Sequence, residues 1–159
     1  MPDTPPPPTN GVSPYLVCAG AAQAIAFYKN AFGAEELMRL DGEDGKIMHA
    51  ALAINGATVM LTDERQEFQN LGPNALGGTP VTLHLYVTDA DTAIARAQAA
   101  GATITMPAQD MFWGDRYGQV KDPFGHSWSI AHALGDHELT GDELRTAAKD
   151  ASCGVPAAN

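Results

Sequence analysis

Basic residues are scarce in this chain, and their scarcity limits the partners it can have. The 159 residues include 9 Lys and Arg against 19 Asp and Glu, which gives a formal net charge of −10. Because no cluster of Lys and Arg offsets this charge locally, the phosphates of nucleic acid and of anionic lipid would be repelled. We therefore expect no nucleic-acid partner. The acidity is compatible with a cationic ligand, or simply with solubility.

Cysteines and long apolar runs are also few. Cys18 lies in an apolar segment and Cys153 in a tail of small residues, so we expect neither a disulfide between them nor a cysteine metal site. No apolar run is long enough to cross a membrane. Met1–Asn10 holds four consecutive prolines and no hydrophobic signal region, which favours an extended leader, a cytoplasmic location and no membrane partner.

The chain contains an internal repeat. Gly56–Leu61 matches Gly125–Ile130 at an offset of 69 residues, and Ala24–Ala26 matches Ala93–Ala95 at the same offset. Two related halves should fold as two related modules. If each module leaves one sheet face uncovered, the modules can enclose a ligand by facing each other.

Each half is predicted to fold as a strand, a helix and three further strands. In the first half, Val12–Cys18 is a short apolar run, and the apolar residues of Ala21–Phe32 recur at helical spacing before Gly33. In the second half, a helix begins after Asp89 and ends at Gly101. The further strands are expected at Glu36–Leu40, Ile47–Ile54, Thr58–Thr62, Thr103–Met106, about Tyr117–Val120 and Ser127–Ala131.

The segments outside the two halves differ in composition. Gln66–Pro80 is rich in Gly, Asn and Pro, as in a loop, whereas Thr140 and Glu143 have capping-box spacing and predict a helix from Gly141 to about Asp150. We therefore divide the chain into a disordered Pro-rich leader (1–10), a first βαβββ module (11–65), a linker loop (66–80), a second βαβββ module (81–134) and a C-terminal helix and tail (135–159).

Alternation along the strands assigns a face to each side chain. Four apolar residues should lie under a helix, namely Val81, Leu83, Leu85 and Val87. His84 and Tyr86 then lie on the opposite face, with Tyr15 at the equivalent place in the first half. Because Asn55-Gly56 favours a two-residue type I′ hairpin, His49 and Met60 join the same face. Small neighbours leave room there, which indicates a lined cavity; the alternative is an ordinary solvated sheet face.

The duplicated plan, with Phe27-Tyr28 and Asp122–His126, resembles the vicinal oxygen chelate superfamily. This superfamily includes glyoxalase I, extradiol dioxygenases, fosfomycin-resistance proteins and bleomycin-binding proteins. Four segments more closely resemble its PhnB-like branch: Ala22–Tyr28, Lys46–Ala50, Leu83–Val87 and Phe112–Gly118. The resemblance implies an α+β fold of two tandem βαβββ modules, with a curved mixed sheet around a pocket and an added C-terminal helix.

The resemblance also implies a test for a metal site. Members often hold a divalent metal through His and Glu from the first and last strands of each module. The corresponding positions here are Ser13, Met60, Thr82 and Ser129, and none is a His or a carboxylate. His84 and His49 are the remaining candidates and supply at most two donors, so we expect no cofactor, with a divalent metal as the alternative. The chain has no Gly-rich loop between a strand and a helix that could hold a nucleotide-like cofactor, so we expect no methyltransferase chemistry.

The segment Trp113–Arg116 is a further candidate for ligand contact. It brings an aromatic ring, a carboxylate and a guanidinium together between Gly114 and Gly118. An Arg beside a cavity can bind an anionic group through two hydrogen bonds. The alternative is a structural turn in which Asp115 and Arg116 pair with neighbouring loops and Trp113 fills the core.

Three functions are compatible with this pattern. The first is a metal-free small-molecule-binding protein, with ligand contacts from Tyr15, His49, Met60, His84, Tyr86, Trp113 and Arg116. The second is a glyoxalase-like lyase or isomerase in which His84 or His49 acts as general acid and base or as a metal ligand. The third is a dimerising scaffold with a vestigial pocket. A homodimer is expected, because exposed strand edges are commonly covered by a partner.

Overall fold

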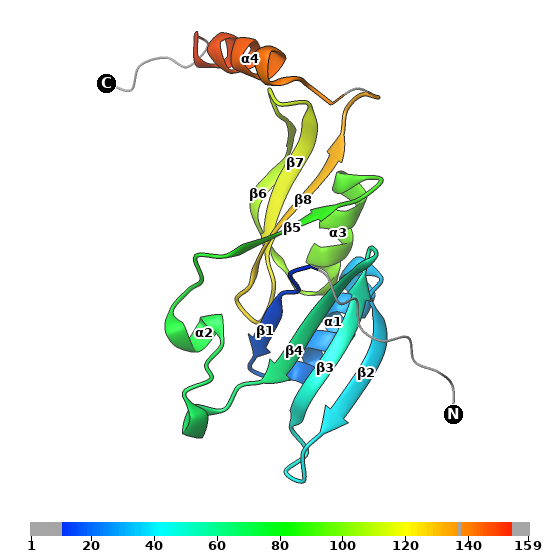
Figure 1. The fold of residues 1–159 in the computed structure, drawn as a ribbon, viewed down its shortest axis with the longest axis vertical. Helices are drawn as coiled ribbons and strands as arrows, with labels where there is room; N and C mark the ends of the chain where they lie inside the picture. Colours follow the sequence, from blue (N-terminus) through cyan, green and yellow to red (C-terminus); the bar gives the residue numbers. More distant parts are fainter. Residues whose placement is uncertain (1–10, 137, 154–159) are drawn as a thin grey trace.

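The computed structural model describes residues 11–136 and 138–153, and in them two α+β modules follow one another along the chain (Figure 1). The first contains β1 (Tyr15–Cys18), α1 (Ala21–Phe32), β2 (Glu35–Asp41), β3 (Ile47–Ile54) and β4 (Ala57–Asp63). The second contains β5 (Thr82–Tyr86), α3 (Ala90–Ala100), β6 (Thr103–Asp110), β7 (Asp115–Lys121) and β8 (Ser127–Ala133). The 3-10 turn η1 (Gln66–Phe68) and α2 (Pro73–Leu76) lie between them, and α4 (Gly141–Cys153) follows.

The two modules have the same topology, which confirms the structural meaning of the repeat. Their sheets have the strand orders β1-β4-β3-β2 and β5-β8-β7-β6, and in each the first and last strands of the module are parallel neighbours. Tyr15 lies opposite Met60 in the first sheet, and His84 lies opposite Ser129 in the second. Both pairs are related by the 69-residue offset, so the predicted two-module α+β fold is confirmed.

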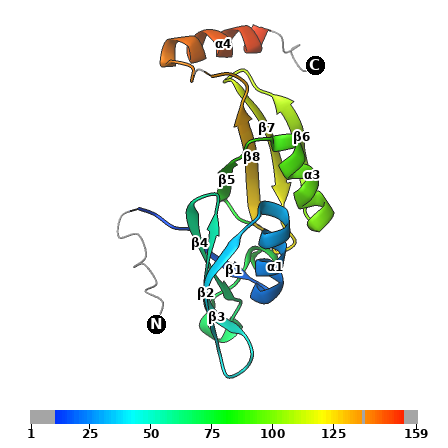
Figure 2. The same cartoon turned by 90° about the vertical axis from the view of Figure 1, so that its right-hand side faces the viewer.

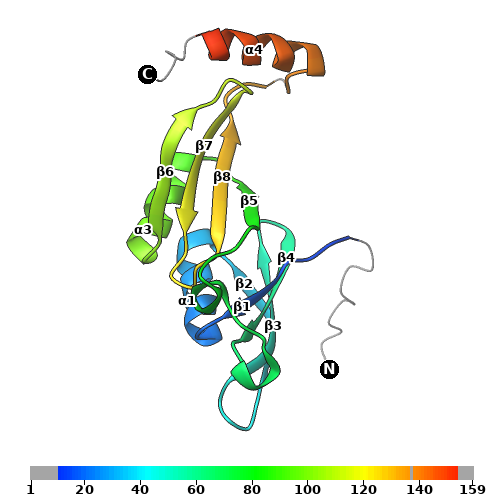
Figure 3. The ribbon, with the colours of Figure 1, turned by 90° about the vertical axis from the view of Figure 1, so that its left-hand side faces the viewer.

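The sheets remain separate, and this corrects one part of the prediction. We expected one curved sheet around a pocket, whereas the structure has two four-stranded sheets that do not close on each other. The modules are stacked along the long axis of the molecule, and α1 and α3 lie on one side of it (Figures 1, 2 and 3). The opposite face of each sheet is left open because a single chain supplies one long helix per module.

Side-chain alternation predicts most of the core, with one error. Leu85 is buried and Leu83 and Val87 are partly buried, as expected, but Val81 lies before the start of β5 and is 63% exposed, so it is not covered by a helix. The residues buried under the helices are Leu16, Cys18, Ala50, Leu52, Ile54, Val59 and Leu61 in the first module and Leu85, Val120, Trp128 and Ile130 in the second. Asp122 joins the modules, since its Oδ2 accepts hydrogen bonds from Tyr28 Oη at 2.7 Å and from Trp128 Nε1 at 3.0 Å. Tyr28 belongs to α1, so this buried carboxylate fixes the first module on the second.

Local turn chemistry sets the element boundaries. Asn55 and Gly56 have φ of 46° and 82°, the pair of positive values that a type I′ hairpin requires, and Ala51 lies opposite Met60 as the hairpin register predicts. Gly33 ends α1 in the left-handed region with φ of 66°. The Asp89 side chain caps α3 by accepting from the Thr92 N–H at 3.1 Å.

Several boundaries differ from the prediction. β1 begins at Tyr15 rather than at Val12, and β6 runs to Asp110 because a register shift after Met106 lets the strand pair again beyond its proline. α4 continues to Cys153. The Pro-rich leader and the end of the tail lie outside the described residues. No helix in the described part of the chain is long and apolar enough to span a membrane.

Candidate functional site

The open face of the second sheet carries a cluster of aromatic and polar side chains. His84 Nδ1 and Ser129 Oγ form a hydrogen bond of 2.7 Å between neighbouring strands. The Tyr86 ring meets the His84 ring edge-on, with centroids 4.8 Å apart, and the Tyr117 ring stacks on His84 at 6.1 Å. Gln119 Nε2 donates to Tyr117 Oη at 2.8 Å. The rings are therefore held by neighbours before any ligand binds.

Asp115 joins this cluster to the turn before β7. Its Oδ2 accepts hydrogen bonds from Tyr86 Oη at 3.1 Å and from Trp113 Nε1 at 3.0 Å. Trp113 also meets Tyr117 edge-on at 5.5 Å. Gly114 allows the turn with φ of 96°. One carboxylate oxygen thus sets the positions of two aromatic rings.

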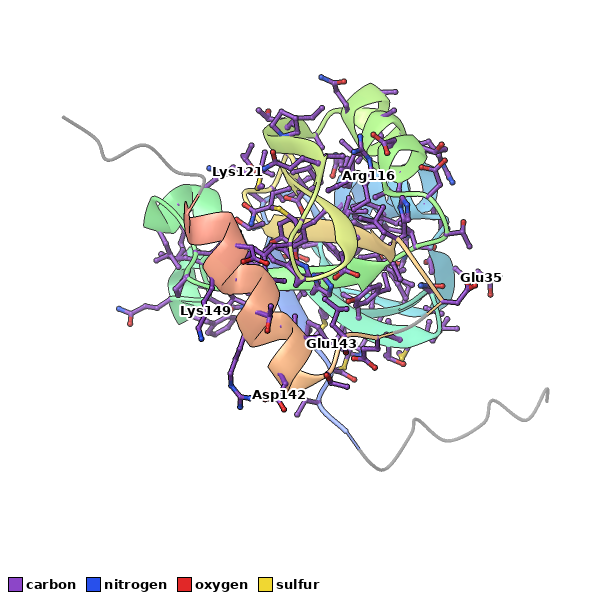
Figure 4. The ribbon with its side chains drawn as sticks, turned by 90° about the horizontal axis from the view of Figure 1, so that it is seen from above. Glu35, Arg116, Lys121, Asp142, Glu143 and Lys149 are labelled. Carbon is purple, nitrogen blue, oxygen red and sulfur yellow. The ribbon has the colours of Figure 1, made fainter. Side chains whose placement is uncertain are left out.

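These rings line a cavity of about 540 Å³ at the end of the second sheet. Its other wall comes from the segment that leads into α4, and the principal lining residues are Tyr86, Trp113, Asp115, Asp136, Glu138, Leu139 and Leu144. Figure 4 shows α4 crossing this end of the molecule, with Asp142 and Glu143 near its start and Lys149 farther along. The volume lies within the range typical of small-molecule sites.

The environment of Tyr86 is electrostatically negative. Partial burial, the hydrogen bond to Asp115 and the charges of Asp115 and Glu138 together raise the pKa of the Tyr86 hydroxyl above its usual value of 10.0. The Tyr86 hydroxyl donates its hydrogen bond to Asp115. The cavity therefore presents carboxylates next to neutral aromatic rings.

Side chains on the open face of the first sheet form a second group, separate from the cavity. Tyr15 Oη and His49 Nδ1 are joined by a hydrogen bond of 3.0 Å, and Met60 lies opposite Tyr15 in the neighbouring strand. Neither Tyr15 nor His49 lines the cavity at Tyr86. Within one chain, the structure thus brings His84, Tyr86 and Trp113 together and places the other group on a different sheet.

Arg116 points away from this cavity. It lies on the helix side of β7, where Nε and Nη2 donate to Asp91 at 2.5 and 2.8 Å and Nη1 donates to Asp110 at 2.9 Å. These carboxylates, Asp91 first, raise the pKa of the guanidinium. Arg116 therefore pairs within the chain, as the alternative reading of this segment proposed, whereas Asp115 and Trp113 reach the cavity.

The positions at which superfamily members often hold a metal do not suit a divalent cation. Ser13, Met60, Thr82 and Ser129 offer three hydroxyls and a thioether rather than imidazoles or carboxylates. His49 and His84 lie on different sheets. In the described ranges, no three His, Cys, Asp or Glu side chains are grouped so that they could hold a metal ion.

Sequence reasoning missed the C-terminal wall of the cavity and the place of Asp115 in it. Alternation contained the signal for Asp115, because Gly118 and Val120 are buried under the helix and Asp115 lies on the other side of the strand. The sequence contains a weaker signal for the C-terminal wall. Leu139 and Leu144 have hydrophobic-staple spacing, which predicts a helix start but not what that start packs against.

Comparison with known proteins gives the chain's relatives. A sequence profile of the Glyoxalase/Bleomycin resistance protein/Dioxygenase superfamily matches residues 12–130. The uncharacterized protein Rv0887c of Mycobacterium tuberculosis is 51% identical over 139 residues, which cover 86% of this chain and 81% of the relative.

Solved structures share the fold. The product of the Arabidopsis thaliana gene At5g48480 superposes with a TM-score of 0.63 at 27% identity, over 77% of this chain and 98% of the other. The PhnB protein from Bacillus cereus superposes with a TM-score of 0.62 over 78% of this chain and 98% of the other; at 21% identity this likeness concerns the fold alone. The segment from Asp136 to Leu144 lies outside the profile match.

Proposed function

Because the chain belongs to the glyoxalase/bleomycin resistance protein/dioxygenase superfamily, we propose that it binds a small molecule in the cavity at Tyr86 and Trp113. The cavity of about 540 Å³, with its two rings fixed on one carboxylate, is the observation that carries this proposal. Preset rings lower the entropy cost of binding. His84 and Tyr117 extend the aromatic surface along the open sheet face.

We further propose that binding does not use the metal geometry of the superfamily. The hydroxyls and the thioether at the four corresponding positions are poor ligands for a divalent cation, and His84 is already hydrogen-bonded to Ser129. The chain would hold its ligand through aromatic contacts and the Asp115 carboxylate instead.

A thermal-shift screen of metabolites and antibiotics tests the binding proposal. A ligand at about 100 times its Kd stabilises the folded state by about 2.7 kcal/mol. For a chain of this size, that stabilisation raises the Tm by about 5–10 °C. The shift should persist in Phe68→Ala, which removes an aromatic side chain that is 73% exposed on η1, and should disappear in Trp113→Ala.

Two results would contradict the proposal. One is a screen without any hit that depends on Trp113. The other is purified protein that holds a stoichiometric divalent metal and loses it in His84→Ala, which would favour the metal-dependent glyoxalase-like enzyme. The metal content therefore separates the two functions without knowledge of the substrate.

We also propose a homodimer. The open face of the first sheet exposes large apolar side chains, with Tyr15 at 53%, Met38 at 45% and Leu40 at 51% exposure. Large apolar side chains exposed on one sheet face mark an interaction surface. Light scattering should give twice the chain mass, and Leu40→Glu should shift the protein toward the monomer; a wild-type monomer would refute the proposal.

A further inference from the structure

The cavity at Tyr86 and Trp113 combines an element inside the superfamily profile match with one outside it. Its aromatic wall lies in the module that the superfamily profile matches. Its other wall follows the matched region and is formed by the described residues Asp136, Glu138, Leu139 and Leu144. Leu139 approaches the Gly114 turn closely, since a side-chain carbon on Gly114 would lie 3.7 Å from Leu139 Cγ. The C-terminal segment therefore faces the turn that carries Trp113 and forms one wall of the site.

The charged side chains that line this cavity share one sign. Among its described lining residues, the ionised groups at neutral pH are the carboxylates of Asp115, Asp136 and Glu138, and no Lys or Arg faces them. The Arg residue nearest along the chain, Arg116, is bound to Asp91 and Asp110 on the opposite side of β7. Within the described ranges 11–136 and 138–153, no lining side chain therefore neutralises the negative charge of the cavity.

The aromatic rings beside these carboxylates favour a cationic ligand. A ring face attracts a cation within about 6 Å of its centroid, most strongly for Trp and next for Tyr. Trp113 and Tyr86 hold the same Asp115 oxygen, which places both rings beside the carboxylate. Leu139 and Leu144 add an apolar wall that suits the carbon substituents of an organic cation rather than a hydrated metal ion.

We propose that the cavity selects organic cations, with a quaternary or protonated amine held between Trp113, Tyr86 and the Asp115 carboxylate. This inference rests on the proposed small-molecule function and adds the charge of the ligand to it. Asp136 and Glu138 act at longer range, because they are exposed and raise the local concentration of cations without fixing them.

A charged probe and its neutral isostere test the selection directly. Choline and 3,3-dimethylbutan-1-ol have the same shape and differ in charge. In full-length protein labelled with ¹⁵N, the indole N–H signal of Trp113, assigned by its loss in Trp113→Phe, reports binding. The indole N–H of Trp128 donates to buried Asp122 and serves as the internal reference. Choline should shift the Trp113 signal with a Kd at least about fivefold below that of the alcohol.

Charge variants assign this preference to the cavity. Asp115→Asn keeps a carbonyl oxygen that can accept hydrogen bonds from both rings. It should raise the Kd for choline by about fivefold or more and change the Kd for the alcohol by less than about twofold. Asp41→Asn makes the same substitution on exposed β2 in the other module and should leave the Kd values for both probes unchanged. Asp136→Asn/Glu138→Gln removes charge without touching the rings and should weaken choline binding by a smaller factor.

The outcomes separate this inference from the function on which it rests. Equal affinities for the two probes, or unchanged choline binding in Asp115→Asn, would overturn the cation selection. If neutral compounds from the screen still shift the Trp113 signal, the small-molecule function stands and the selection fails. If no compound and neither probe shifts that signal, both fail.

Discussion

The buried hydrogen bond between Tyr28 and Asp122 should carry much of the coupling between the two modules. Tyr28 is 0% exposed and Asp122 is 4% exposed, and the Tyr28 hydroxyl donates to Asp122 Oδ2 at 2.7 Å. The same carboxylate accepts from the N–H groups of Phe124, His126 and the Trp128 indole. Tyr28→Phe would therefore remove one of four donors from a buried charge.

The magnitude follows from the kind of bond that is lost. A hydrogen bond to a charged group contributes about 1.5–3 kcal/mol, and Phe leaves the shape of the core almost unchanged. For a chain of this length, each kcal/mol corresponds to about 2–4 °C, so we expect Tyr28→Phe to lower the Tm by about 3–12 °C. Chemical denaturation with an unchanged m-value would show that the loss is one of stability and not of compactness.

Tyr15→Phe provides the matched control. The Tyr15 hydroxyl also forms a hydrogen bond, to His49, but its side chain is 53% exposed, so the loss should stay within about 0.5 kcal/mol. In an Asp122→Asn background, Tyr28→Phe should cost less, because the charged acceptor is already gone. Equal effects of Tyr28→Phe and Tyr15→Phe would refute the reasoning.

Three further predictions concern helix capping, alkaline stability and close packing. Asp63 accepts backbone N–H groups at the start of α1 and of β3, and His132 Nδ1 accepts the N–H that begins α3 at 2.9 Å. His132→Ala should therefore cost about 0.5–2 kcal/mol in urea unfolding, and Asp63→Ala more; a smaller loss in Asp63→Ala would contradict this. Burial, followed by the charges of Asp122 and Asp63, raises the pKa of the Cys18 thiol from 9.0 to about 12. The unfolded chain then loses this proton first, so the Cys18 contribution to stability is complete below pH 9 and is lost as the pH rises to about 12. Cys18→Ala should flatten this part of the stability curve, and an unchanged slope would argue against it. A Cβ on Gly118 would lie 2.6 Å from Ile94 Cδ1, so Gly118→Ala should cost about 1–3 kcal/mol in thermal unfolding. Gly135→Ala, which meets no atom within 4 Å, is its control.

The repeat relates more than the order of the elements. Asp63 and His132 are related by the 69-residue offset, and both accept the first N–H of their module's long helix. We did not predict this pair, because the two side chains have nothing in common except that each can accept a hydrogen bond. Once the register is known, the offset identifies the pair directly.

The candidate site shows where sequence reasoning ends. Alternation placed His84 and Tyr86 on the open face, and both lie there. It also placed Tyr15 and His49 on an equivalent face, but alternation cannot tell whether two equivalent faces meet. In the structure they belong to separate sheets of one chain, and the wall opposite Tyr86 comes from the segment before α4.

The sequence alone determined the local structure and the topology of each module. Apolar periodicity, the positive φ of Asn55-Gly56 and the Asp89 cap are properties of neighbouring residues, so they can be predicted from the chain. The tertiary structure decided which distant segments meet. It paired Arg116 with Asp91 and Asp110, placed Asp115 between Tyr86 and Trp113, and brought Leu139 to the same cavity as Gly114. These contacts depend on how whole elements pack, and the free energy of that packing is not set by any local pattern.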